Sequence, residues 1–237
     1  MKLKVCSLYF YLFLTTTSSM IIQNYNQKEE TYFNNARLDI LPLLPEYSES
    51  VLEIGCGNGA TLKYLKDRGK CKVTTGIELT EPAASEAKQH IDITLLGDAE
   101  KIINTLDSDS YDTVLCLDIL EHLVEPWLMV EQISRVLKKD GLAIASIPNL
   151  RTFRVISNLA ISGKFDYADT GIMDKTHLRF FTRTSALELL KTDALEVDHW
   201  IHSPFAAMSK SAIFNTITFG IFRDLLTEQY LIRAVKK

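Results

Sequence analysis

Three side chains that could do chemistry stand close together in the stretch Asp118-Ile-Leu-Glu-His122. Asp118, Glu121 and His122 are spaced i, i+3 and i+4, so a helical turn that begins there would place all three on one face. With His177, further along the chain, they form a set of two carboxylates and two imidazoles that could hold a divalent cation such as Mg²⁺. In the other interpretation, Glu121 and His122 cap and pack the next helix, and Asp118 serves a bound cofactor alone.

His177 is also our candidate for a general base, and His122 is the second candidate catalytic residue. An imidazole titrates near neutral pH, so it can take a proton from a reacting group. His177 lies in the dense run Asp174-Lys-Thr-His-Leu-Arg-Phe-Phe-Thr182, which shows no clean helical or strand period. The alternative role is that of a loop histidine bonded to Asp174 or to a backbone carbonyl.

Alternate glycines mark a second place for chemistry. The run at residues 51–54 leads into Gly55-Cys-Gly-Asn-Gly59. With Ala60, this loop satisfies the dinucleotide fingerprint G-x-G-x-x-G/A, in which a bare backbone approaches a pyrophosphate. Glu53, two residues before the first glycine, would repel that anion. A ligand with a cationic centre and an ammonium group would instead be attracted to it.

Acidic residues also follow the next predicted strands. Glu78, in the segment GIEL, can accept hydrogen bonds from both hydroxyls of a ribose. Asp98, in the segment GDAE, can accept one from an adenine amino group. Together with the acids of the two stretches above, they place a carboxylate at or near four successive strand ends. This pattern indicates a nucleoside-binding edge.

The elements that must position these residues alternate between strands and helices, which is typical of a parallel sheet covered by helices. Short apolar and β-branched runs predict strands at residues 50–54, 72–77, 93–96, 111–117 and 142–147. Helical spacing predicts helices at residues 60–67, 82–90, 100–106 and 126–138. The later chain predicts a helix at 185–192, a strand at 195–201, an apolar helix at 205–226 and a strand at 229–234. The irregular region at 149–184 is predicted to be an insertion on the acceptor side, above the strand ends.

Size and composition narrow the class of protein. The 237 residues suffice for one well-buried core, so we predict a single domain over residues 20–237. A formal net charge of −4 provides no footprint for a nucleic acid, which is therefore not an expected partner. The 4 cysteines include no C-x-x-C pair, which favours reduced thiols and a cytoplasmic protein.

Two apolar stretches bear on membranes. Residues 1–19 have the outline of a signal peptide, or else form an over-long start before Met20. Their apolar run, residues 5–14, is shorter than the ~20 residues of a membrane span. Polar and charged residues interrupt the stretch at 205–226, so we predict an amphipathic helix there. We expect no integral membrane domain, and a peripheral membrane contact is left open.

The successive motifs of class I S-adenosylmethionine-dependent methyltransferases resemble five segments of this chain in order and spacing: VLEIGCGNG, GIEL, GDAE, YDTVLCLDILEHL and LKKDGLAIASIPN. The later segment GKFDYADTGIMDKTHLRFFTRTSALELL is similar to small bacterial methyltransferases that accompany glycosyltransferases in surface-polysaccharide synthesis. The resemblance runs from about Met20 to the C-terminus. It departs at Glu53, where the family more often has Asp, and at residues 1–19, which have no counterpart.

The resemblance implies an α/β fold with a Rossmann-like seven-stranded, mostly parallel sheet, helices on both faces and a last strand antiparallel between the fifth and sixth. It also implies S-adenosylmethionine as the cofactor, with the glycines under its methionine and ribose portions, Glu78 on the ribose, and Asp98 with Ala99 beside the adenine. The implied cofactor contacts are Glu53, Gly55, Cys56, Gly57, Asn58, Gly59, Glu78, Leu79, Asp98, Ala99 and Asp118.

The resemblance also bears on whether this chain binds a divalent metal. A similar Glu-x-x-Glu-His followed by a distant His binds a divalent metal in small-RNA ribose 2′-O-methyltransferases, and the ubiquinone-pathway O-methyltransferases have a related cluster. In this chain the first position is Asp118, which is shorter by one methylene. The resemblance therefore implies a metal site at Asp118, Glu121, His122 and His177 in partial form.

We predict an enzyme that uses S-adenosylmethionine to methylate an oxygen of a carbohydrate or similar small polar acceptor, free or as part of a glycan. A quinone-type phenol or an RNA ribose is the alternative acceptor if the metal site is real. From a different class, an NAD-dependent oxidoreductase would use the glycines and Glu78 but leave Glu53 and the stretch 118–122 without a task. A further alternative is a cofactor-binding protein that has lost catalysis.

Overall fold

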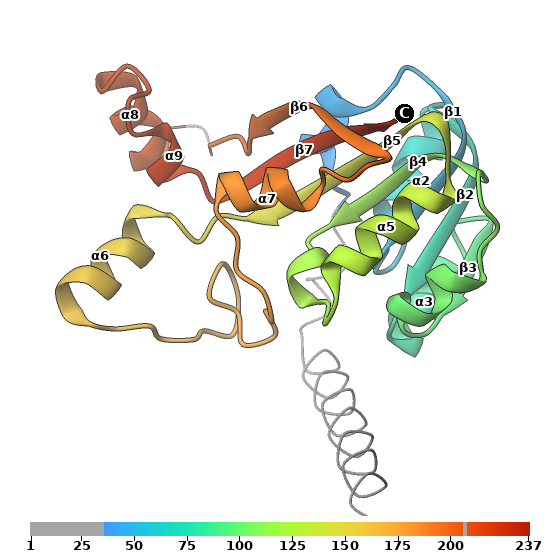
Figure 1. Ribbon diagram of the computed structural model, residues 1–237, viewed down its shortest axis with the longest axis horizontal. Helices are drawn as coiled ribbons and strands as arrows, with labels where there is room; N and C mark the ends of the chain where they lie inside the picture. The colour runs from blue at the N-terminus through green and yellow to red at the C-terminus, as the bar shows by residue number, and fades with distance from the viewer. Residues whose placement is uncertain (1–35, 206–207) are drawn as a thin grey trace, which may run out of the picture.

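One sheet of seven strands organises the computed structural model, which describes residues 36–205 and 208–237 (Figure 1). The strands are β1 (Ser48–Ile54), β2 (Cys71–Glu78), β3 (Ile93–Leu96), β4 (Tyr111–Leu117), β5 (Leu137–Pro148), β6 (Leu195–His202) and β7 (Gln229–Lys236). Their order across the sheet is β3-β2-β1-β4-β5-β7-β6. Strands β1 to β5 pair in parallel, whereas β7 runs antiparallel to β5 and β6 on either side. The predicted Rossmann-like sheet with an antiparallel last strand is confirmed.

Helices cover both faces of this sheet. They are η2 (Leu38–Leu43), α2 (Ala60–Asp67), α3 (Glu81–Ala87), α4 (Ala99–Ile102), η3 (Ile103–Thr105), η4 (Leu120–His122), α5 (Pro126–Val136), α6 (Phe153–Ser162), α7 (Arg183–Leu189), α8 (Lys210–Ile217) and α9 (Arg223–Leu226), where η marks a 3-10 helix. On one face Ile133 of α5 packs in a core with Leu52 of β1. On the other face Leu62 of α2 packs in a core with Val51. Side chains of a strand alternate between faces, so a strand buried on both sides is apolar along its length.

Two predictions about the later chain need correction. The region at 149–184 is not wholly irregular, since α6 occupies ten of its residues, although α6 buries only Val155. The predicted helix at 205–226 is broken. After α8, Phe219 and Gly220 take positive φ angles of 52° and 78°, a left-handed backbone that cannot continue a right-handed helix.

Two predictions concern membrane segments. Segment 1–19 lies outside the described residues. In the part of the chain that the structure describes, no helix is both long and apolar enough to cross a membrane.

The carboxyl ends of β1 to β5 lie along one edge of the sheet. The antiparallel strand β7 starts at the same edge, because its first residue, Gln229, pairs with Pro148 at the end of β5. Ligands of open α/β sheets bind at such an edge. The predicted site residues that follow β1, β2, β3 and β4 are therefore brought to one side of the molecule.

Gly76, in the middle of β2, sets how closely the glycine loop can approach the sheet. A Cβ atom at Gly76 would lie 2.4 Å from the Cys56 Sγ atom and 2.8 Å from the Ile91 Cδ1 atom. We expect Gly76→Ala to lower the free energy of unfolding by about 1–3 kcal/mol, because extra volume in a packed core forces its neighbours apart. Urea denaturation measures this change.

The matched control for that prediction is the double variant Gly76→Ala with Cys56→Ala. It should regain part of the loss, since it removes the sulfur but leaves Ile91 in contact. A single variant that unfolds at the same urea concentration as the unaltered protein would contradict the packing argument.

Candidate active site

The glycine loop joins β1 to α2 at the carboxyl edge. Gly55 has a φ of +75°, and a Cβ there would lie 3.1 Å from Ile119. Gly59 has a φ of +79° and directly precedes α2. Both angles fall in the left-handed region that glycine adopts without strain. The loop therefore turns tightly and presents backbone rather than side chains to the edge.

Glu78, the last residue of β2, is hydrogen-bonded to this loop. Its Oε2 atom accepts a hydrogen bond from the Gly57 N–H at 3.0 Å, and its Oε1 atom accepts two from Thr80, from the N–H at 2.9 Å and from the hydroxyl at 2.8 Å. Leu79 lies between them in the turn that follows β2. Each carboxylate oxygen has two lone pairs, so Oε2 keeps one acceptor position. The ribose contact of Glu78 stays a prediction that this geometry leaves room for.

Glu53 is a buried acid in the middle of the sheet. Its side chain is 3% exposed, and its Oε2 atom has no hydrogen-bond partner among the described residues. Burial raises the pKa of Glu53 to about 8, although the charge of Arg37 and a hydrogen bond from Thr61 act in the opposite direction. A buried polar atom without a partner is costly. A ligand that brings an ammonium group would satisfy it.

Several other predicted cofactor residues have structural tasks. Asp98 caps α4, which begins at Ala99, by accepting a hydrogen bond from the Glu100 N–H at 3.0 Å. Asn58 donates to the Glu86 carboxylate at 3.1 Å and accepts a hydrogen bond from the first N–H of α2. Burial raises the pKa of the Cys56 thiol, which keeps it protonated. These contacts hold the loop in shape and leave direct cofactor contact as a prediction.

Asp118 follows β4 with a φ of +56° and is held from three sides. Its carboxylate accepts hydrogen bonds from Arg37, from the Ser146 hydroxyl at 2.6 Å and from the Gln229 amide at 2.8 Å. Arg37 also forms an ion pair with Asp39 at 2.8 Å. The Asp118 carboxylate is therefore tied to Arg37 and to residues of β5 and β7.

Arg37 is a site residue that the sequence reasoning missed. It precedes β1 and donates to a carboxylate 81 positions away in the chain. The signal that could have found it is its isolation, because it is the only cationic residue between Lys28 and Lys63. A lone cation just before a glycine loop lined by acids is a candidate to bind the anionic part of a ligand.

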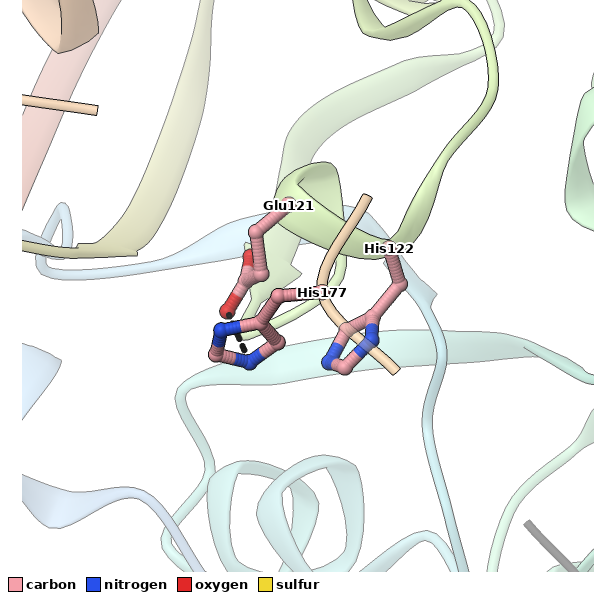
Figure 2. Close-up of side chains that lie close together, drawn as sticks. All are labelled: Glu121, His122 and His177. Carbon is pink, nitrogen blue, oxygen red and sulfur yellow. Dashed lines mark ion pairs between the residues drawn. The ribbon is translucent and has the colours of Figure 1, made fainter. Parts of the chain in front are cut away.

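Glu121, His122 and His177 converge in the interior (Figure 2). All three are buried, and one ligand atom from each lies within 4.8 Å of the others. The His177 Nε2 atom is 3.9 Å from the Glu121 Oε1 atom, and the two imidazole rings meet edge to face with centroids 4.6 Å apart. The structure thus brings together three of the four predicted metal residues, while Asp118 is not part of the group.

The two imidazole rings are oriented by backbone carbonyl groups. The Nδ1 atom of His122 lies 3.0 Å from the carbonyl oxygen of Thr176, and that of His177 lies 3.0 Å from the carbonyl oxygen of Ile172. A carbonyl oxygen only accepts, so each Nδ1 is the donor in its hydrogen bond. This is the arrangement by which histidines that bind metals are commonly held.

The turn that carries Glu121 is also tied to the insertion. The Glu121 carbonyl oxygen accepts hydrogen bonds from the N–H groups of Leu178 and Arg179, at 2.8 and 3.0 Å. Glu121 and His122 lie in η4, a 3-10 turn, instead of the predicted helical turn. Neither caps α5, whose preceding residue is Glu125 and which has no side-chain cap. The capping half of the alternative interpretation is therefore wrong, whereas the packing half holds, since η4 lies against α5. The distant His177 reaches the cluster beside this backbone pairing.

Comparison with known proteins identifies the domain. The family described as "Methyltransferase domain" matches residues 52–145, which span the glycine loop, Glu78, Asp98 and the cluster residues Glu121 and His122. Residues 52–145 are thus similar to a methyltransferase domain, and the fold is that of class I methyltransferases. This confirms the prediction of an enzyme of the S-adenosylmethionine-dependent methyltransferase class, and the family implies that cofactor.

Curated relatives of this methyltransferase domain share the name "Ubiquinone biosynthesis O-methyltransferase". The protein from Glaesserella parasuis serovar 5 is 27% identical over 128 residues, which are 50% of this chain and 53% of that protein. The protein from Coxiella burnetii (strain Dugway 5J108-111) is 28% identical over 156 residues, which are 59% of this chain and 64% of that protein. The chain thus spans between half and two thirds of the length of these relatives, so its own reaction and acceptor are matters for proposal.

Solved structures resemble the methyltransferase domain in fold. An S-adenosylmethionine-dependent methyltransferase from Archaeoglobus fulgidus has a TM-score of 0.60 at 18% identity and covers 97% of this chain and 100% of its own. The cyclase SpnF has a TM-score of 0.55 at 15% identity and covers 81% of this chain and 75% of its own. The fold alone therefore does not determine the reaction, which has to be argued from the site.

Proposed function

We propose that this protein transfers a methyl group from S-adenosylmethionine to a hydroxyl oxygen of a small ring-shaped acceptor, with a divalent cation held by Glu121, His122 and His177. The convergence of these three buried side chains carries the proposal. One carboxylate and two imidazole nitrogens are a ligand set that suits a divalent metal. A cation held there would lower the pKa of an acceptor hydroxyl.

The residues around the glycine loop suit the cofactor, which supplies the methyl group on a sulfonium centre. The partnerless Glu53 oxygen would accept a hydrogen bond from its ammonium group, and Glu78 would accept one from a ribose hydroxyl. The charge of Arg37 is balanced within the protein by Asp39 and Asp118. Glu53 and Glu78 act by holding the methyl group in line with the acceptor and away from water. Glu53 also disfavours NAD, because a pyrophosphate would meet a buried acid.

A cluster of aromatic rings lies beside His177. Phe165, Tyr167 and Phe180 contact one another with ring centroids 5.7 to 6.2 Å apart, and the His177 ring lies 6.3 Å from that of Phe180. Aromatic faces stack on flat rings. Since the relatives above are named for ubiquinone biosynthesis, a phenol-type ring is our first candidate for the acceptor. The carbohydrate or glycan acceptor remains a prediction, as does a cytoplasmic location.

Two cationic side chains in the region at 149–184 form ion pairs within the protein. Arg183 forms an ion pair with Asp224 at 2.8 Å, and Lys175 forms one with Asp169 at 2.7 Å. Their charges are therefore already balanced within the protein. This observation favours an uncharged ring over a nucleotide-linked acceptor.

Calorimetric titration of the purified protein with S-adenosylmethionine, S-adenosylhomocysteine and NAD tests the cofactor. We expect both sulfur ligands to bind and Glu78→Ala to weaken them by about tenfold or more, since hydrogen bonds to a charged group contribute ~1.5–3 kcal/mol. Glu81→Ala, which alters an exposed acid on the neighbouring helix, is the control. Binding of NAD alone would overturn the proposal.

A further inference from the structure

Two segments at the carboxyl edge expose large apolar side chains to solvent. The first is α6, and the second runs from Met208 through α8 to Arg223. Phe219 is 94% exposed and Ile161 is 84% exposed, which are extreme values for such residues. The apolar side chains exposed by the two segments are Phe153, Ile156, Leu159, Ile161, Met208, Ile213, Phe214, Ile217, Phe219, Ile221 and Phe222. Exposed apolar surface on this scale marks an interaction site.

Both segments leave the sheet at the same edge. The chain enters the α6 segment after Pro148, which pairs with Gln229, and it enters the α8 segment after His202, which pairs with Tyr230. Gln229 and Tyr230 are neighbours at the start of β7. Figure 1 accordingly shows α6, α8 and α9 beyond the same end of the sheet. We call the exposed apolar residues of the two segments, together with their cations, the end surface.

The charge of the end surface has one sign. Residues 150–165 contain Arg151, Arg154 and Lys164 and no acid, and residues 203–223 contain Lys210 and Arg223 and no acid. The chain as a whole has a net charge of −4, so this end is electrostatically distinct. Asp224, which follows directly, is paired with Arg183 at 2.8 Å and more loosely with Arg151 at 3.9 Å, so Arg154, Lys164, Lys210 and Arg223 carry most of the unbalanced charge. Apolar side chains interspersed with cations and free of acids are the composition that binds an anionic lipid surface.

We propose that the end surface docks this protein on an anionic lipid bilayer, with the side chains of Phe219, Ile221 and Ile161 entering the interface. A symmetric contact with a second copy is less favourable, because it would place the same cations opposite one another. The docking surface does not depend on the proposed reaction, because it can be measured without cofactor or acceptor. If the proposed methyl transfer is also correct, docking would bring the carboxyl edge of the sheet close to the bilayer, in which an apolar acceptor dissolves.

Flotation of the full chain with vesicles tests the proposal. Vesicles of phosphatidylcholine alone are compared with vesicles that also contain phosphatidylglycerol. We expect the protein to float with the anionic vesicles and to be released by high salt, since cationic contacts at a lipid surface are screened. Equal flotation with both kinds of vesicle, or with neither, would overturn the proposal.

Two pairs of variants locate the contact. Phe219→Ser with Ile221→Ser should reduce flotation by about tenfold or more, since burying each side chain contributes ~1.5–3 kcal/mol. The control pair, Tyr47→Ser with Val73→Ser, alters exposed residues at the opposite edge of the sheet and should float unchanged. Both proteins should retain the circular dichroism and melting temperature of the unaltered chain.

The outcomes separate the alternatives. If the end-surface variant floats as well as the control variant, the contact lies elsewhere in the chain and the proposal is wrong. If the unaltered protein stays with neither vesicle but elutes as a dimer that the end-surface variant abolishes, the surface binds a second copy and the lipid proposal is overturned. The lipid proposal is supported if the variant Phe219→Ser with Ile221→Ser loses flotation and the control variant does not.

Discussion

Replacing Glu121 by glutamine should lower kcat by on the order of a hundredfold or more, because a divalent cation at a reacting oxygen contributes several kcal/mol of charge stabilisation. The change keeps the volume of a fully buried side chain and removes only its charge. Affinity for S-adenosylmethionine should stay nearly constant, since Glu121 is not among the predicted cofactor contacts. The rate of methyl transfer to a catechol and the binding of Mn²⁺ followed by paramagnetic resonance measure the two effects.

Glu125→Gln is the control for that prediction, because it alters an exposed carboxylate four residues further on. If Glu121→Gln binds Mn²⁺ as well as the unaltered protein does, the cluster is not a metal site. Activity that resists a chelator but disappears in His177→Ala would instead assign His177 as the general base. Activity that survives both changes would remove the cluster from the chemistry.

Glu53→Gln should have the largest effect on the cofactor, with affinity for S-adenosylmethionine lowered by about 10- to 100-fold. The buried carboxylate would make a charge-assisted hydrogen bond to the cofactor's ammonium group, and such bonds contribute ~1.5–3 kcal/mol. Binding should also depend on pH in the unaltered protein, because the pKa of Glu53 is about 8 and a cationic ligand favours its ionised form. Affinity should therefore rise as the pH approaches 8, and this rise should be absent in the variant.

The same substitution should stabilise the protein without ligand at alkaline pH. The folded-state pKa of Glu53 lies above the ordinary value of 4.5, so the folded protein holds this proton more tightly than the unfolded chain. This tighter proton binding adds to the free energy of unfolding. The added stability is fully present below about pH 4.5, falls as the pH rises and is lost above about pH 8. The variant should gain melting temperature at about pH 9 relative to about pH 5. Glu49→Gln, an exposed acid on the same strand, should show neither effect, and a pH-independent gain in Glu53→Gln would refute the titration argument.

The parallel half of the fold was predictable because local signals and tertiary structure agree there. Apolar runs define β1 and β4, and the glycine loop between β1 and α2 needs backbone angles that few other residues adopt. The boundary at Val136 was not predictable. Helical spacing continues past it, yet β5 begins at Leu137, because pairing with Tyr111 of β4 prevails over local preference.

The residues of the candidate site also include some that could be predicted from the sequence and some that could not. Acids at strand ends could be placed on one edge from topology alone, which is why Glu53, Glu78 and Asp118 were foreseeable. Arg37 was not, since its contact with Asp118 is made across 81 positions by a segment with no motif of its own. The metal residues were identified by type, but their geometry depends on the pairing of the Glu121 carbonyl with the insertion, which leaves no trace in the sequence.

During synthesis, β7, which pairs with both β5 and β6, is the last of the seven strands to leave the ribosome. β7 lies between them in the sheet, and its first residue, Gln229, donates to Asp118 from 111 positions later in the chain. A nascent chain that has not reached β7 therefore leaves one edge of β5 unpaired, and such an edge can join a strand of another molecule. Closing contacts over this span slows folding. We expect the growing chain to need protection at β5 until β7 fills the gap.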